Sequence, residues 1–198
     1  MHAFSPGFVT RFRQAIHALH PIDDSTLLSF LEQFEEVEAK KGTILLREGE
    51  VCRHLYFILK GSLRCYLHDE KGREVNQHFY FEDELASEFK SLRLQEPSDR
   101  HLVCMTPCKL LKAARPDYLP LFETNIDFNQ AAFRFFQDLY LQEEEHAEML
   151  RRLSAEDRYR YVVEHKPHLL QRVSLTQLAS WLGTSRESLS RIRARINS

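Results

Sequence analysis

The segment with the most specific chemistry lies close to the C-terminus, at residues 174–196, and reads SLTQLASWLGTSRESLSRIRARI. Ser174 is followed three residues later by Gln177, which is the spacing of a capping box that begins a helix. Gly183 follows this short helical stretch, at the place where a left-handed residue ends a helix and turns the chain. A second helical stretch comes next, so the segment predicts a helix-turn-helix.

The second helix of this segment is predicted to carry a basic outer face. Thr184 can cap its start, with Glu187 three residues later, and Leu189 and Ile192 form its apolar side. Arg can donate two hydrogen bonds to a guanine edge, and Ser or Arg can hold phosphates. The predicted DNA contacts are Thr184, Ser185, Arg186, Glu187, Ser188, Arg191 and Arg195. Two interpretations of Glu187 stay open, a contact to a cytosine amino group and a helix cap.

Charge is distributed unevenly along the chain. Residues 154–198 contain eight Lys or Arg and four Asp or Glu, a net charge of +4, whereas the first 153 residues carry −6. A basic end on an acidic body indicates that only this end meets a polyanion. The charge difference alone fits a chance distribution on a soluble surface equally well, so sequence motifs must distinguish the two interpretations. For the helical motif, the alternative is a helical hairpin with a solvated basic face.

The middle of the chain alternates with a period of two, which is typical of strands. Glycines interrupt this alternation between residues 37 and 81, and residues 69–72 (DEKG) are predicted to form a hairpin turn. A further strand pair is expected at 102–105 and 109–113, on either side of Pro107. Short strands at this spacing predict a jelly roll, also called a double-stranded β-helix, with flanking helices.

A long helix is predicted after Pro120, because no Gly or Pro interrupts residues 125–153. Its apolar positions recur in steps of four and three residues, the heptad pattern of paired helices. The predicted dimer interface consists of Phe128, Ala132, Phe135, Leu139, Gln142, His146, Met149 and Leu153. The same stripe would suit a helix that packs on its own domain. A partner helix is favoured because ~25 residues reach ~38 Å, beyond a small barrel.

Length and composition fit an α+β protein of 198 residues with three parts. We expect a β-roll domain at 1–124, a dimerisation helix at 125–153 and a DNA-binding domain at 154–198. No apolar run approaches the ~20 residues of a membrane span, and no signal peptide is visible. The four Cys are too few for a disulfide scaffold. These observations predict reduced thiols and a cytoplasmic location.

In this combination the chain resembles the Crp/Fnr superfamily of bacterial transcription regulators over nearly its whole length. The segments similar to the glycine-punctuated strands of the cyclic-nucleotide-binding β-roll are 41–43 (KGT), 48–50 (EGE) and 55–64 (LYFILKGSLR). Residues 185–192 (SRESLSRI) are similar to the family's recognition helix. The resemblance implies base contacts by Arg186, Glu187 and Arg191.

The region that holds the nucleotide in such relatives departs from their pattern. Relatives that bind a nucleotide carry Gly-Glu, whose Glu holds the ribose, and later Arg-Ser or Arg-Thr, whose Arg holds the phosphate. Here Ala86-Ser87 and Asp99-Arg100 stand at these places, and an Asp repels a phosphate. We therefore expect no regulation by cAMP. Two alternatives stay open, a pocket for another small molecule and no effector at all; the candidate pocket region is Ala86, Ser87 and Arg100.

Enzymatic and metal chemistry find little support in the sequence. Cys104 and Cys108 flank Met-Thr-Pro, which predicts a turn between strands and buried thiols in place of metal ligands. The histidines at 68, 78 and 101 are isolated and lack the alternate spacing of metal-binding jelly rolls. No nucleophile motif or phosphate-binding glycine loop occurs. We therefore predict no enzyme activity, no cofactor and no metal.

The predicted protein is a homodimeric regulator that binds a palindromic operator in double-stranded DNA, with successive major grooves ~34 Å apart. RNA polymerase is a candidate for a further partner, a small-molecule effector is left unknown, and a membrane is not expected. The alternative is a regulator that responds to a cyclic nucleotide or another small molecule through a divergent pocket. Little sequence is available before Ser174 for a β-wing, so the wing is expected to be reduced or missing.

Overall fold

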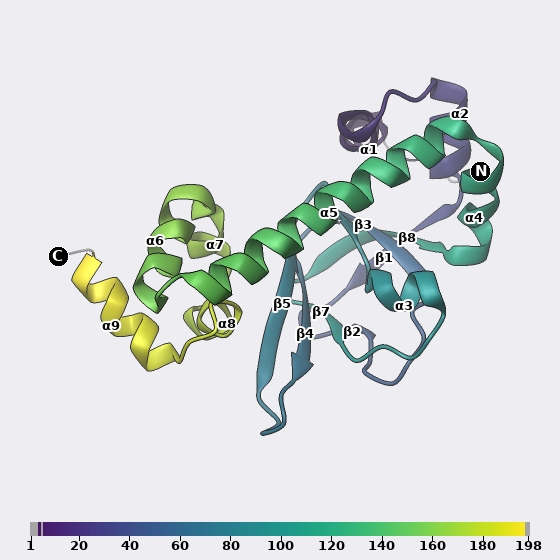
Figure 1. The fold of residues 1–198 in the computed structure, drawn as a ribbon. Helices are drawn as coiled ribbons and strands as arrows, with labels where there is room; N and C mark the ends of the chain where they lie inside the picture. The colour runs from purple at the N-terminus through teal and green to yellow at the C-terminus, as the bar shows by residue number, and fades with distance from the viewer. Residues whose placement is uncertain (1–3, 5, 197–198) are drawn as a thin grey trace. The chain divides into compact units, whose positions relative to one another are not determined.

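The computed structural model describes residues 4 and 6–196, and the chain forms two compact units. The first unit comprises Met1–Cys65 and Phe79–Asp138, and the second comprises Tyr66–His78 and Leu139–Ser198. The second unit therefore combines a hairpin from the middle of the sequence with the C-terminal helices (Figure 1).

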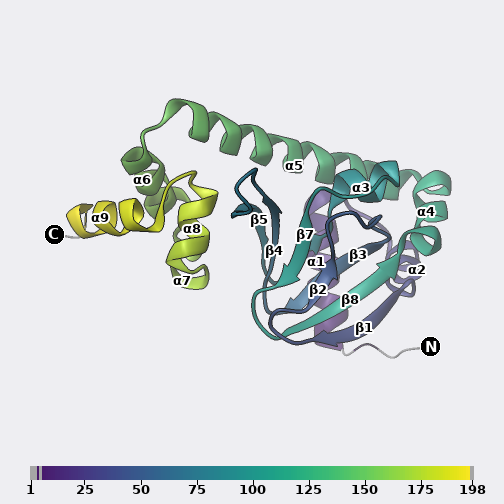
Figure 2. The ribbon, with the colours of Figure 1, turned by 90° about the horizontal axis from the view of Figure 1, so that it is seen from below.

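The β-roll is built from short strands in two four-stranded sheets (Figure 2). One sheet has the order β1-β8-β3-β6 and the other has the order β2-β7-β4-β5. The strands are β1 (Phe34–Ala39), β2 (Ile44–Leu46), β3 (His54–Lys60), β4 (Leu63–His68), β5 (Glu74–Tyr80), β6 (Leu85–Ala86), β7 (His101–Cys104) and β8 (Cys108–Ala114). The predicted strand pair around Pro107 is confirmed as β7 and β8, and the jelly-roll prediction is confirmed with it.

Strand β3 shows why the period of two specifies this architecture. Leu55, Phe57 and Leu59 point to one side and join a core with the helices. Tyr56 and Ile58 point to the other side and join the core inside the roll. Successive side chains of a strand face opposite sides of the sheet, so a strand covered on both faces must be apolar throughout.

Helices α1 (Pro6–Leu19), α2 (Asp24–Leu31), α3 (Phe89–Leu94) and α4 (Arg115–Thr124) complete the first unit. Asp23 caps α2 by accepting a hydrogen bond from the amide of Thr26 at 3.0 Å. Phe12 of α1 is fully buried, with its ring centroid 5.0 Å from that of Phe57 and 5.7 Å from that of Phe30. The contact of Phe12 with Phe57 is edge-to-face and that with Phe30 is tilted, and such aromatic contacts hold the helices against the sheet.

The second unit contains the tip of the β4–β5 hairpin and the helices α5 (Ile126–Arg152, from Leu139 onward), α6 (Ala155–His165), α7 (Pro167–Arg172), α8 (Leu175–Trp181) and α9 (Arg186–Ile196). The predicted hairpin turn is confirmed, because Gly72 has φ +71° and the amide of Asp69 donates to the carbonyl of Arg73 at 3.0 Å. The segment before Ser174, where a reduced or missing β-wing was expected, forms helix α7. From Arg115 to Ile196 the chain forms no strand, as predicted.

Helix α5 is the predicted long helix, with 27 residues. It begins in the first unit and ends in the second, whereas the predicted domain at 125–153 treats it as a separate part. In the described part of the chain, none of the helices combines the length and the apolar character that crossing a bilayer requires.

Candidate nucleic-acid interface

The chain reversal between α8 and α9 has the predicted geometry. Ser174 and Gln177 form the capping box of α8, in which Ser174 Oγ accepts from the Gln177 amide at 3.3 Å and Gln177 Oε1 accepts from the Ser174 amide at 3.2 Å. Gly183 has φ +61°. The amide of Thr184 then donates to the carbonyl of Ala179 at 2.9 Å, which satisfies a helix-end carbonyl.

The cap of α9 lies one residue later than predicted. Helix α9 begins at Arg186, and the hydroxyl oxygen of Ser185 accepts a hydrogen bond from the amide of Ser188 at 3.1 Å. Thr184, the predicted cap, closes the turn instead, so the predicted pairing of Thr184 with Glu187 does not form. Glu187 lies in the first helical turn, where the helix dipole stabilises its negative charge.

The outer face of α9 follows from the burial of Leu189 and Ile192. At 100° per residue the positions opposite these two are 187, 190, 191 and 194, and the side chains there are exposed. Arg186 is exposed at the start of the helix beside them. Ser190 belongs to this face although it was not among the predicted contacts; its position opposite the apolar pair is the signal that could have identified it.

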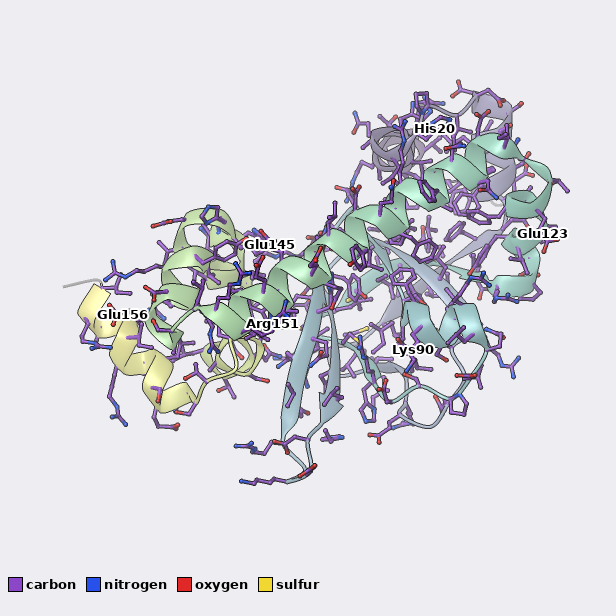
Figure 3. All side chains as sticks on the ribbon, in the orientation of Figure 1. His20, Lys90, Glu123, Glu145, Arg151 and Glu156 are labelled. Carbon is purple, nitrogen blue, oxygen red and sulfur yellow. The ribbon has the colours of Figure 1, made fainter. Side chains whose placement is uncertain are left out.

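Three of the predicted contacts have side-chain partners within the protein: Ser185, Ser188 and Arg195. Arg195 Nη2 lies 3.0 Å from Glu156 Oε2 of α6, and the other carboxylate oxygen of Glu156 accepts from Arg160 at 2.9 Å (Figure 3). Ser188 is half-buried and its hydroxyl accepts from that of Ser185 at 3.0 Å. Arg186, Glu187 and Arg191 are therefore the predicted residues that the fold leaves most open to a ligand.

Arg158 of α6 holds the reversal in place, a role that the sequence did not indicate. Its Nη1 donates to the carbonyl of Leu182 at 2.6 Å, and its Nε donates to the carbonyl of Leu153 at 3.0 Å. A Cβ added to Gly183 would lie 3.0 Å from the same Nη1. One guanidinium thus connects the end of α5 to the turn that precedes α9.

Replacing Arg158 by Met is expected to lower the free energy of unfolding of the second unit by about 1.5–3 kcal/mol, because charge-assisted hydrogen bonds to partly buried carbonyls are lost. Trp181 is the only tryptophan and is buried in this unit, so its fluorescence during urea denaturation reports the change. Arg160→Met is the matched control and should leave the stability nearly unchanged, because Arg160 makes an exposed ion pair that water screens. Equal losses in the two variants would contradict the role of Arg158.

The hairpin tip holds α8 through backbone hydrogen bonds. Ser180 Oγ donates to the carbonyl of Glu74 at 2.8 Å and accepts from the amide of Asn76 at 2.9 Å. Trp181 Nε1 donates to the carbonyl of Gln77 at 3.2 Å. Helix α8 is therefore held by polar contacts with the hairpin. The outer face of α9 stays exposed.

His146 of α5 packs against the same helix. Its ring stacks on Trp181 with centroids 4.2 Å apart and an interplanar angle of 5°, and its Nε2 lies 3.0 Å from the Trp181 carbonyl. Burial lowers the pKa of His146 below its ordinary value, because the charged form loses hydration, although the hydrogen bond to the Trp181 carbonyl opposes the shift.

Most side chains of the predicted dimer interface pack against residues of their own chain. Phe128 is 1% exposed and Met149 is 5% exposed. Ala132 and Phe135 line a cavity of the first unit, and His146 stacks on Trp181. The remaining predicted positions are half-buried or polar: Leu139, Gln142 and Leu153. A second subunit could not contact Phe128 or Met149 while both stay buried, so this part of the predicted interface is corrected.

The apolar face that α5 does leave exposed carries other residues. They are Ile126, Phe133, Phe136, Tyr140 and Leu141. Phe133 and Tyr140 are seven residues apart and lie 58% and 65% exposed on the same side of the helix. Such a stripe is unusual on a helix in contact with water alone.

The predicted ligand region is occupied by internal contacts. Ser87 is buried and its hydroxyl donates to the carbonyl of His54 at 2.9 Å. Glu88 beside it is 3% exposed, and its carboxylate accepts from the amides of Lys90 and Ser91 at 3.3 and 2.8 Å. Ala86 is completely buried. The first amides of α3 thus already bind an anion, the side chain of Glu88.

Arg100, the third predicted ligand residue, has Ser98 and Asp99 as its polar neighbours. Its Nε is buried without a hydrogen bond and lies 3.7 Å from Asp99 Oδ1. Its amide donates to the buried hydroxyl of Ser98 at 3.0 Å. Among the residues that the structure describes, Arg100 forms no hydrogen bond with Ser87. Direct contacts therefore do not bring these two predicted ligand residues together.

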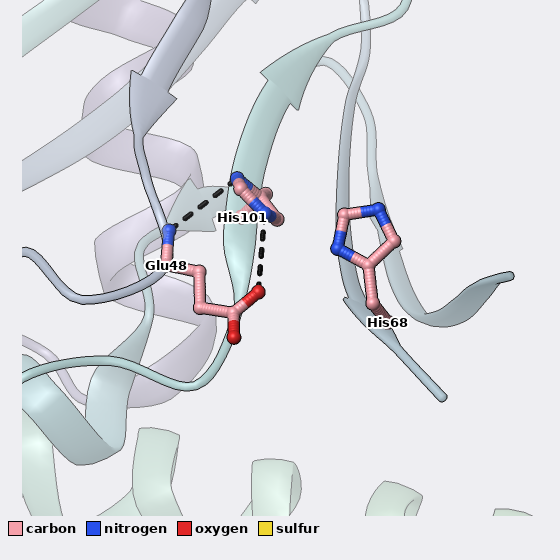
Figure 4. A group of neighbouring side chains, drawn as sticks. All are labelled: Glu48, His68 and His101. Atoms are coloured by element: carbon pink, nitrogen blue, oxygen red, sulfur yellow. Dashed lines mark hydrogen bonds and ion pairs between the residues drawn. The ribbon is translucent and has the colours of Figure 1, made fainter. Parts of the chain in front are cut away.

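His101 has a partner on the first unit and is less isolated than predicted. Figure 4 shows its ring beside Glu48, with Nδ1 accepting from the Glu48 amide at 3.3 Å and Nε2 lying 3.5 Å from Glu48 Oε2. The four cysteines are buried free thiols. Cys108 Sγ donates to the carbonyl of Thr106 at 3.2 Å within the turn between β7 and β8.

Comparisons with known proteins agree with this architecture. Residues 36–125 match the family model of the cyclic nucleotide-binding domain. The c-di-GMP responsive global regulator CLP of Xanthomonas campestris has a TM-score of 0.70 and 22% identity, covering 88% of this chain and 92% of that chain. The Catabolite Activator Protein of Thermus thermophilus has a TM-score of 0.58 and 23% identity, covering 92% and 86%.

A third solved structure, FixK2 of Bradyrhizobium japonicum, has a TM-score of 0.67 and 16% identity, covering 83% of this chain and 84% of that chain. None of the curated proteins matches this chain. The fold expected from the resemblance is confirmed: the chain has the α+β fold of the Crp/Fnr-type regulators, with a match to the cyclic nucleotide-binding domain over residues 36–125.

Proposed function

We propose that the protein is a transcriptional regulator of the Crp/Fnr type that binds a palindromic operator as a homodimer. The observation that carries this proposal is the exposed side of α9: Glu187 and Arg191 lie opposite the buried apolar pair, and Arg186 is exposed beside them at the start of the helix. A capped helix, a glycine turn and a second helix with a basic outer face suit a major groove. Nothing in this arrangement requires an enzymatic reaction.

The homodimer part of the proposal rests on the exposed face of α5. Phe133, Phe136 and Tyr140 recur in steps of three and four residues, the spacing by which two parallel helices pack. A second copy of α5 would cover these side chains and place two α9 helices on one duplex. Two half-sites on the same face of the DNA would then be one helical turn or a multiple of it apart.

Independence from cAMP is also part of the proposal. The buried carboxylate of Glu88 accepts the first two amides of α3, and Ser87 stands where nucleotide-binding relatives have Glu. A nucleotide phosphate near these amides would meet a buried negative charge. The proposed regulator therefore responds to a different molecule or to none.

Arg186→Ala is expected to weaken binding to the selected operator by about 1–3 kcal/mol and to relax specificity at one base pair in each half-site, because Arg reads a guanine edge through two hydrogen bonds. The measurement is fluorescence anisotropy on the operator and on its single-base variants, after selection of the operator from random duplexes. Arg160→Ala removes the same charge from α6 and serves as the control. A loss that is equal for every sequence would mark Arg186 as a phosphate contact.

Calorimetry with cAMP and cGMP is expected to give no heat of binding at micromolar nucleotide. The physical reason is the repulsion between the phosphate and the buried Glu88 carboxylate. The Glu88→Gln variant is the informative control, because it removes the charge and keeps the side-chain shape. Micromolar binding of either nucleotide by the natural chain would contradict this part of the proposal and favour the cyclic-nucleotide receptor.

A further inference from the structure

The second unit contains a small polar pocket that the exposed face of α9 does not use. Its volume is about 50 Å³, and Trp181 of α8 lies on its border. The hairpin, the second half of α5, α6 and the residue that follows α6 contribute titratable side chains to it. These are His78, Glu143, Glu145, His146, Tyr161 and Lys166. Ionisable groups gathered around so small a space affect one another's protonation.

Both carboxylates of the pocket have basic partners. Glu143 Oε1 lies 3.4 Å from His78 Nδ1. Glu145 Oε2 lies 3.4 Å from Lys166 Nζ. Neither of these two pairs includes His146, so a positive charge on His146 would arise next to a second imidazole and an ammonium group that already share the nearby carboxylates.

His146 itself is held by contacts that its neutral form satisfies. Its ring lies flat on that of Trp181, with centroids 4.2 Å apart, and its Nε2 lies 3.0 Å from the Trp181 carbonyl. Nε2 therefore carries the proton of the neutral ring, and Nδ1 carries the lone pair. Within residues 4 and 6–196, Nδ1 has no hydrogen-bond partner and is not completely enclosed. A further proton can thus be added at Nδ1 without breaking the bond at Nε2.

That proton places a charge in unfavourable surroundings. Burial lowers the pKa of His146, because the charged ring loses hydration, and the hydrogen bond to the Trp181 carbonyl opposes this shift. Glu143 attracts the charge, whereas His78 and Lys166 repel it. The charged ring regains its hydration when it leaves the face of Trp181. Protonation therefore favours a state in which the two rings are apart.

The direction of the pH effect follows from this difference between the stacked and the opened state. Above the ordinary His pKa of about 6.5 the ring is neutral in both states, and the stack keeps its full stability. Between about 6.5 and the lowered pKa of the stacked ring, the opened state binds more protons, so falling pH favours opening. Below the lowered pKa both states are protonated and the effect levels off.

We propose that the contact between His146 and Trp181 is a pH-sensitive switch, in which the neutral ring holds α8 against α5 and the protonated ring releases it. Trp181 is the last residue of α8, and Leu182 and Gly183 follow it in the turn that leads to α9. Movement of Trp181 therefore reaches the helix pair directly. That release weakens operator binding rests on the proposed function, whereas the release itself does not.

Acrylamide quenching of Trp181 fluorescence in the full-length protein tests the switch. Trp181 is the only tryptophan and is 7% exposed, so the quenching constant should be small near neutral pH. It is expected to rise at least about twofold between about pH 7.5 and about pH 5.5, because the opening equilibrium grows about tenfold per pH unit between about 6.5 and the lowered pKa. Acrylamide is uncharged, so its own access does not depend on pH.

Two variants identify the responsible imidazole. His146→Phe keeps a flat ring for Trp181 and cannot take up a proton, so its quenching constant should not depend on pH. His78→Gln is the matched control, because it removes the other imidazole of the pocket, and it should retain the pH response of the natural chain. The proposal is overturned if the natural chain shows no response, or if His146→Phe responds as the natural chain does.

NMR titration of the His146 ring in the natural chain gives a test that depends on no variant. The pKa of His146 is expected to lie below about 6.5. A pKa at or above that value would mean that attraction of the imidazolium to the Trp181 face outweighs burial, which would overturn the proposal.

Operator affinity is measured separately, by anisotropy at the same two pH values. It should fall with pH in the natural chain and fall less in His146→Phe. A protein whose Trp181 becomes accessible at low pH but which ignores every duplex keeps the switch and loses the proposed function. A protein that binds its operator while Trp181 stays equally protected at both pH values loses the switch alone.

Discussion

If the proposed homodimer forms through α5, a chain in which Phe133 and Tyr140 are both replaced by Glu is expected to be monomeric at concentrations where the natural chain is expected to be dimeric. The two side chains lie 58% and 65% exposed on one side of α5, and two carboxylates facing their copies in a symmetric helix pair would repel each other. Operator affinity should fall by about 10²–10⁴-fold, because a dimer binds its second half-site intramolecularly and a monomer does not. Analytical ultracentrifugation and anisotropy on the selected operator measure the two effects.

The control for this experiment is the Phe133→Leu, Tyr140→Leu variant. It keeps the face apolar and is expected to remain dimeric with operator affinity near that of the natural chain. The circular dichroism spectrum of the Glu variant should stay unchanged, since both positions are exposed and Glu is a good helix former. A Glu variant that still sediments as a dimer would place the interface elsewhere on the protein.

Replacing Gly61 by Ala is expected to lower the free energy of unfolding by about 2–5 kcal/mol. Gly61 follows β3 with φ +98°, and an added Cβ would lie 2.6 Å from the Pro107 carbonyl and 2.7 Å from Cys108 Sγ. A left-handed conformation costs a non-glycine residue ~1–2 kcal/mol, and overpacking a buried site costs ~1–3 kcal/mol more. Urea denaturation followed by circular dichroism measures the total.

Gly42 provides the matched control for the clash. It also has a positive φ, +83°, but a Cβ there would have no atom within 4 Å. Gly42→Ala should therefore show only the conformational part, about 1–2 kcal/mol. If the two variants lose the same stability, the close approach of Gly61 to the β7–β8 turn contributes nothing to folding.

Elements with a local signal were predicted well from the sequence. The strands on either side of Pro107, the glycine turn at Gly72 and the capping box at Ser174 each depend on a few neighbouring residues, so their chemistry is visible in a short window. The cap of α9 was displaced by one position because Thr184 and Ser185 are both good caps. Only the turn geometry, in which the Thr184 amide bonds to Ala179, decides between them.

The orientation of α5 was harder to predict, for a physical reason. Helix α5, with 27 residues, carries two apolar stripes, and the heptad pattern of Phe128 and Phe135 describes the inner one, which packs on its own chain. The sequence shows that a stripe exists and does not show what covers it. The outer stripe through Phe133 and Tyr140 became recognisable once the burial of Phe128 was known.

Contacts between residues far apart in the sequence could not be predicted. Arg158 was recognised only as part of a basic tail, yet it joins the carbonyls of Leu153 and Leu182. The contact of Trp181 with Gln77 spans more than one hundred residues of sequence and leaves no periodic signal. Single-sequence patterns record which side chains are apolar or charged, and pairing of this kind requires the fold.

The composition of the second unit has a consequence for how the protein can be divided. Because Tyr66–His78 contributes the carbonyls of Glu74 and Gln77 to α8, a fragment cut at Leu139 would strip the Ser180 hydroxyl and the Trp181 indole of their acceptors. The C-terminal helices therefore cannot be transferred alone to another sensor domain with all their hydrogen bonds intact. Any viable chimera would have to inherit the hairpin together with the helices it supports.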